Sequence, residues 1–86
     1  MISIDEKKFA DEIMNKLYQK EISFPFIRPV DPINDNCPNY DDIIKTPMCL
    51  NFVKERLNNS YYESLDAWVK DIELIWTNAL TYNMSY

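Results

Sequence analysis

The chain has 86 residues, a net charge of −5 and 47% hydrophobic residues, a composition typical of one small folded domain. It contains no histidine and no glycine, which excludes catalytic triads, histidine metal sites and glycine-rich phosphate loops. An acidic domain would repel a nucleic acid and suits a basic partner, although acidity that only keeps the domain soluble explains the charge as well.

The apolar segments are too short to cross a membrane, and the first residues lack the apolar run of a signal peptide. We therefore expect an intracellular protein that binds neither a membrane nor nucleic acid directly. Two cysteines, Cys37 and Cys49, cannot form a four-ligand zinc site unaided, and in a reducing compartment they should be free thiols. We expect no metal and no cofactor.

The first predicted helix covers residues 5–21. Its apolar side chains form one stripe at helical spacing: Phe9, Ala10, Ile13, Met14, Leu17 and Tyr18. Ser3 or Asp5 could cap its start, because either side chain can accept a hydrogen bond from a backbone amide of the first turn.

Residues 22–48 hold all five prolines, which forbids a long helix there. The segment is nevertheless rich in aromatic and aliphatic side chains, so we expect an ordered loop packed on the domain. A short helical turn is predicted around residues 39–44. Because the chain lacks glycine, asparagines are the expected residues at left-handed turn positions.

Two more helices are predicted, over residues 49–57 and 65–83. The face of the first is Leu50, Val53 and Leu57. The wide stripe of the second is Leu65, Trp68, Val69, Ile72, Ile75, Trp76 and Ala79. Asn58-Asn59 supply the turn between them, and Ser64 is the predicted N-cap. No segment alternates as a strand would, so the predicted fold is all-α.

Two acidic patterns suggest chemistry that their context does not support. Asp31, Asp35 and Asp42 match three positions of a calcium-binding EF-hand loop, but Asn36 replaces its glycine and Ile33 replaces a ligand. The adjacent side chains of Asp41 and Asp42 would point apart in a helical turn. They are therefore better explained as solvated surface charges than as a pair for acid–base catalysis. Nothing indicates an enzyme.

The loop and the end of the last helix together could form a binding pocket. The side chains that could wall it are Phe24, Phe26, Val30 and Tyr40. Tyr82 and Asn83 stand where that loop could meet the last helix. The alternative is that Asn83 only ends the helix and Tyr82 only packs.

Four motifs occur in order along the chain: FPF at 24–26, PVDP at 29–32, PNYDDIIKTPM at 38–48 and VKDIELIWTNALTYN at 69–83. In this combination the chain resembles a bromodomain over most of its length. The resemblance implies a left-handed bundle of four helices. The first three helices and the long ordered loop are matched here as a single domain over residues 1–86. The fourth helix is missing, as though the domain were truncated before it.

The resemblance also implies a site that binds acetylated lysine. Asn83 matches the asparagine that donates to the acetyl carbonyl, and Tyr40 matches the tyrosine that reaches it through a water. The other matched pocket positions are Phe26 and Val30 on the walls, Phe24 and Pro25 on the shelf, and Tyr82 beside the asparagine. Asp35 and Cys37 replace aliphatic pocket residues and form a possible polar rim. Cys49 replaces an aspartate that can cap the second helix.

The implied function is a non-enzymatic reader of acetylated lysine peptides, such as histone tails, in nuclear, chromatin-linked transcription regulation. The missing fourth helix leaves apolar helix faces uncovered, so we expect some self-association. It also motivates the alternative, a helical docking or dimerisation module without acetyl-lysine affinity.

Overall fold

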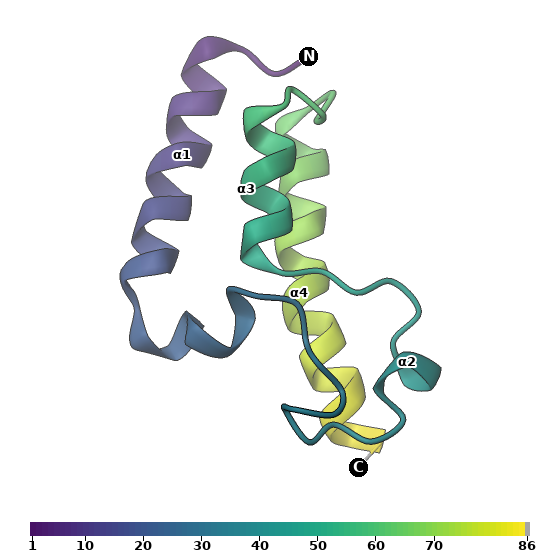
Figure 1. The fold of residues 1–86 in the computed structure, drawn as a ribbon. Helices are drawn as coiled ribbons and strands as arrows, with labels where there is room; N and C mark the ends of the chain where they lie inside the picture. The colour runs from purple at the N-terminus through teal and green to yellow at the C-terminus, as the bar shows by residue number, and fades with distance from the viewer. Residues whose placement is uncertain (86) are drawn as a thin grey trace.

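The computed structural model describes residues 1–85, and its regular elements are all helical (Figure 1). They are α1 (Ile4–Gln19), the 3₁₀ helix η1 (Glu21–Phe26), α2 (Tyr40–Ile43), α3 (Leu50–Asn58) and α4 (Leu65–Ser85). The described residues contain no strand, so the all-α prediction is confirmed. No helix among them is long and apolar enough to span a membrane.

The start of α1 is fixed by Ser3 and not by Asp5. The Ser3 Oγ accepts a hydrogen bond from the Glu6 amide at 3.1 Å, and the Glu6 carboxylate accepts one from the Ser3 amide at 2.9 Å. This reciprocal capping box satisfies two amides that no helical carbonyl can reach. The helix ends at Gln19, two residues before the predicted end, because Lys20 is extended and the chain then enters η1.

The segment from η1 to α3 is ordered by its own short-range bonds. The Asp31 Oδ1 accepts from the amides of Ile33 at 3.1 Å and Asn34 at 3.2 Å, which closes a tight turn. Asn36 and Asn39 take positive φ angles of 53° and 61°, the left-handed conformation that glycine would otherwise supply. The helical turn predicted around residues 39–44 is α2.

The core lies where α1, α3 and α4 run side by side (Figure 1). Its buried side chains are Ala10, Met14, Leu50, Val53, Leu57, Tyr62, Trp68 and Ile75. Burying one side chain such as Leu50 contributes about 1.5–3 kcal/mol, and the cluster brings together eight such buried side chains. Part of the apolar surface stays open, since Phe9 on α1 is 50% exposed and Leu80 on α4 is 63% exposed.

A polar clamp joins the end of α3 to the first half of α4. The Arg56 guanidinium pairs with Asp71 at 2.8 Å, and the Tyr62 hydroxyl donates to the same carboxylate at 2.7 Å. Arg56 also lies over the Tyr61 ring, 4.4 Å from its centroid. Burial and the bond to Asp71 hold the pKa of Tyr62 well above its usual value, so its hydroxyl remains a donor.

Candidate functional site

The loop segment between η1 and α3 folds back over the carboxyl-terminal half of α4 and encloses a cavity there. The cavity has a volume of about 470 Å³ and receives side chains from η1, the loop, α2 and α4. All nine predicted pocket and rim residues line it: Phe24, Pro25, Phe26, Val30, Asp35, Cys37, Tyr40, Tyr82 and Asn83. The structure therefore brings together residues from Phe24 to Asn83, which lie 59 positions apart in the sequence.

Asn83 lies in the last turn of a long helix. α4 continues to Ser85, where the Ser85 hydroxyl donates to the Thr81 carbonyl at 2.9 Å. Asn83 is thus not the residue that ends the helix, which corrects the predicted end at residue 83. Its side chain is exposed and lines the cavity, so its amide is accessible to a ligand.

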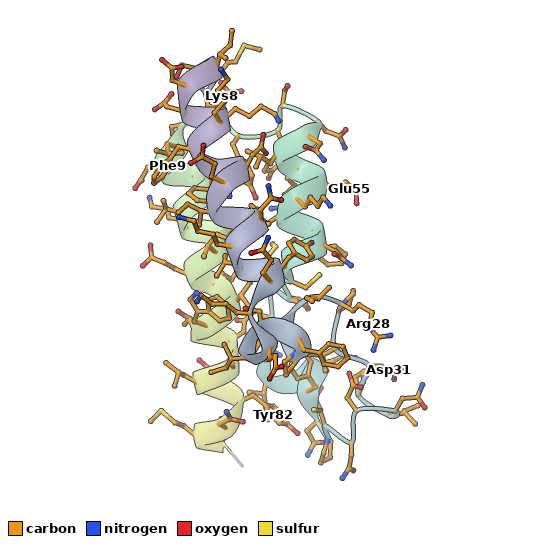
Figure 2. All side chains as sticks on the ribbon, turned by 90° about the vertical axis from the view of Figure 1, so that its left-hand side faces the viewer. Lys8, Phe9, Arg28, Asp31, Glu55 and Tyr82 are labelled. Carbon is orange, nitrogen blue, oxygen red and sulfur yellow. The ribbon has the colours of Figure 1, made fainter. Side chains whose placement is uncertain are left out.

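Tyr82 fastens the loop to α4 beside Asn83. Its hydroxyl donates to the Pro38 carbonyl at 2.9 Å, and Figure 2 shows Tyr82 on the last turns of α4. Its ring also lies 5.4 Å from the ring of Tyr40, at an angle of 49°. The pair joins the helix to α2 and closes one wall of the cavity.

Tyr40 also brings a polar group to the cavity, and it is only 7% exposed. Burial is the main cause that raises the pKa of Tyr40 above its usual value, and the nearby Cys37 adds to it. The hydroxyl therefore keeps its proton at neutral pH and can both donate and accept a hydrogen bond.

The remaining walls are apolar. The Phe26 ring packs edge-on against Trp76, with centroids 5.0 Å apart, which fixes it beneath the cavity. Phe24 is 70% exposed and forms an open shelf at the mouth. Sequence reasoning missed five further lining residues: Arg28, Pro29, Met48, Ile75 and Ala79. Ile75 and Ala79 precede Asn83 by eight and four positions, so helical periodicity was the signal that could have found them.

Asn78 is a further residue near the site that the sequence did not reveal. It is 9% exposed, and its side-chain amide donates to the Thr46 carbonyl at 2.8 Å. This bond ties the end of the loop to α4 about one turn before Tyr82. Two bonds from one helix, through Asn78 and Tyr82, thus hold the loop at both ends of α2.

The rim is polar where Asp35 and Cys37 stand. Asp35 and Asp31 exchange two hydrogen bonds, and the Cys37 thiol donates to the Asp35 carbonyl at 3.5 Å. Both cysteines are free, as predicted, and Cys49 makes no side-chain cap for α3. Two aspartates of the EF-hand alternative, Asp31 and Asp35, use their carboxylates to bond backbone amides of their own turn.

Apolar walls, an accessible amide and a buried hydroxyl suit a neutral, slender ligand group with one hydrogen-bonding end. A helical bundle with such a loop-lined pocket is the architecture of the bromodomains, a class of acetyl-lysine recognition modules. The family model described as Bromodomain matches residues 10–85, and the chain belongs to this family.

The relatives give the same assignment. The chain is 37% identical over 81 residues to the SWR1 complex bromodomain subunit bdf1 of Schizosaccharomyces pombe, with 91% of this chain and 14% of that protein covered. It is 40% identical over 83 residues to Bromodomain-containing factor 2 of Saccharomyces cerevisiae, covering 91% of this chain and 13% of the relative. The chain thus spans less than a fifth of the length of these relatives.

The fold is also that of a solved bromodomain. The second bromodomain of Candida albicans Bdf1, bound to an imidazopyridine, superposes with a TM-score of 0.85 at 32% sequence identity. The match covers 93% of this chain and 78% of that chain. The predicted bromodomain-type bundle is therefore confirmed.

Proposed function

We propose that the cavity binds the side chain of acetylated lysine, with Asn83 as the direct donor to the acetyl carbonyl. Tyr40 reaches the same oxygen through a water, and Val30, Pro25 and Phe26 enclose the stem. The observation that carries this proposal is the placement of one accessible amide and one protonated phenol in a single, otherwise mostly apolar cavity.

The physical chemistry of the ligand supports the assignment. Acetylation removes the lysine charge and leaves an amide on an apolar stem. An uncharged stem can pack among the apolar walls of this cavity, whereas an ammonium group would lose much of its hydration between them. The domain therefore distinguishes the two forms of lysine without any catalytic step.

The expected affinity is modest. Burying four methylenes and a methyl is worth about 4 kcal/mol, and one hydrogen bond adds about 1 kcal/mol. Immobilising the peptide offsets part of this gain. We expect a Kd on the order of 10 µM to 1 mM for a singly acetylated peptide.

Acetylated histone tails are the proposed partners, in the nucleus and in chromatin-linked regulation. The net charge of −5 favours encounter with basic tails. One relative is by its name a subunit of the SWR1 complex, and the family relationship carries a similar setting to this chain as part of the proposal.

The test is an NMR titration of the labelled domain with one histone-tail peptide in acetylated and unacetylated forms. We expect shifts near Asn83 and Tyr40 with the acetylated form only, and their loss in Asn83→Ala. Asn15→Ala is the matched control, since Asn15 is an exposed helical asparagine outside the cavity. Equal shifts with both peptide forms, or unchanged binding by Asn83→Ala, would refute the proposal.

A second function, docking or dimerisation through helix faces, is favoured by the exposed apolar side chains on α1 and α4. Phe9 is 50% exposed, Leu80 63% and Met84 86%. Sedimentation velocity across a hundredfold concentration range tests it. A compact monomer throughout would refute self-association, and an interaction that depends on Trp76 but not on Asn83 would favour docking over acetyl-lysine recognition.

A further inference from the structure

The rim of the cavity carries opposite charges on two neighbouring parts of the loop. Asp35 and Arg28 both line the cavity, and Asp31 bonds directly to Asp35. In the view of Figure 2, Arg28 and Asp31 lie on the same edge of the molecule. Among the described residues, the ion pairs lie on the helices and at the amino-terminal residue, and none involves these three side chains.

The Asp35 carboxylate is held in place before any ligand arrives. Its Oδ2 accepts from the Asp31 amide at 2.9 Å, and the Asp35 amide donates to the Asp31 carbonyl at 2.8 Å. Asp31 is itself fixed by three bonds, from the amides of Ile33 and Asn34 and from the Asn34 side chain at 2.7 Å. These bonds lower the pKa of Asp31 below its usual range, so Asp31 adds a second negative charge next to Asp35 at neutral pH.

When the acetyl-lysine of a peptide occupies the cavity, the residues that flank it in the peptide must lie along this rim. In an extended peptide, successive residues are about 3.3 Å apart, so the side chains on either side of the acetyl-lysine fall within reach of the mouth. A fixed carboxylate loses little conformational entropy when it pairs with a cation, which makes it a better partner than a mobile one.

We propose that Asp35 determines specificity. Its carboxylate makes the domain bind peptides in which an unmodified lysine or arginine flanks the acetyl-lysine more tightly than peptides with neutral flanking residues. This inference rests on the proposed acetyl-lysine binding. Arg28 acts in the opposite direction, because its guanidinium repels the same flanking cation. The domain would then bind a singly acetylated peptide whose neighbouring residues are still basic. It would bind the same peptide less tightly once the neighbouring lysine is also acetylated and loses its charge.

The test compares two acetylated peptides that differ only in a flanking lysine or glutamine. Kd values are measured for wild type, Asp35→Asn, Arg28→Gln and Asp42→Asn. Asn keeps an oxygen that can accept from the Asp31 amide. Asp42 is an exposed carboxylate of α2 that does not line the cavity, so Asp42→Asn is the matched charge control.

We expect wild type to prefer the lysine-flanked peptide by about three- to fivefold at low salt, the range of a partly exposed ion pair. Asp35→Asn should abolish the preference, Asp42→Asn should keep it, and Arg28→Gln should increase it. The preference should also shrink at high salt.

Three outcomes would overturn the inference: no preference in wild type, a preference that survives in Asp35→Asn, or an equal loss in Asp42→Asn. In each of them, binding that still depends on Asn83 leaves the proposed function standing. If neither peptide binds in an Asn83-dependent way, the proposed function fails and this inference fails with it.

Discussion

Asn78→Ala removes the bond that fastens the end of the pocket-forming loop to α4. Asn78 is 9% exposed and donates to the Thr46 carbonyl at 2.8 Å. Losing a net hydrogen bond costs about 0.5–1.5 kcal/mol, and the space left by the amide adds to that cost. We expect a loss of about 1–2 kcal/mol in the free energy of unfolding.

For a domain of this size, each 1 kcal/mol lowers Tm by about 4–8 °C, so Asn78→Ala should lower it by roughly 5–15 °C. Circular dichroism at 222 nm during heating and during urea unfolding gives both quantities. Asn15→Ala, on the exposed side of α1, should change the free energy of unfolding by less than about 0.5 kcal/mol. An Asn78→Ala protein as stable as wild type would refute the reasoning that this bond anchors the loop.

The anchor also has a consequence for binding. Thr46 precedes Met48, which lines the cavity, so a released loop end should loosen one wall. We expect Asn78→Ala to weaken acetylated-peptide binding as well as folding, at a temperature where both proteins remain folded. Equal affinity of the two proteins at that temperature would show that the wall is held without the bond.

Substitutions at three other positions test local features. Cys49→Ser supplies the side-chain cap that α3 lacks and should raise stability by about 0.5–1 kcal/mol in urea unfolding; a decrease would show that the buried position rejects a hydroxyl. Asn36→Ala should destabilise by about 1 kcal/mol because φ is 53° there, whereas Asn36→Gly should be tolerated, and equal Tm values for the two would contradict this. Asp31→Leu should lower the free energy of unfolding at pH 7. The hydrogen bonds to the Asp31 carboxylate lower its pKa in the folded state, so they stabilise the fold above the unfolded-state pKa of this group. This stabilisation is lost as the pH falls through the lower pKa of the folded state. A difference from wild type that does not shrink in acid, measured by unfolding at a series of pH values, would refute that account.

Much of the domain could be predicted because its signals are local or repeated. The three- and four-residue spacing of apolar side chains places α1, α3 and α4, since such a stripe is stable only when it faces a core. The loop motifs and the closing Tyr-Asn pair indicated the pocket because several specific pieces occur in order. Each of these signals lies within a short window of the sequence.

The remaining features depend on contacts between distant residues. Asn78 lies outside the apolar stripe predicted for α4, so the sequence gives it no role. It anchors the loop only because its side chain donates to the carbonyl of Thr46, 32 residues earlier. η1 contains Pro25 and was expected to be irregular, yet a 3₁₀ turn tolerates that proline. No sequence pattern assigns a role to Arg28, and it lines the cavity only because of the path that the loop takes.

The packing of Phe26 against Trp76 gives the domain an internal optical reporter. The chain has two tryptophans, and they occupy different settings. Trp68 is 3% exposed in the core, whereas Trp76 is half-buried and touches the ring that floors the cavity. In a Trp68→Phe protein, the emission of Trp76 would follow the filling of the cavity through its contact with Phe26. In a Trp76→Phe protein, the emission of Trp68 would follow the integrity of the core. The two single-tryptophan variants thus report ligand capture and unfolding as two separate fluorescence signals, without an attached dye.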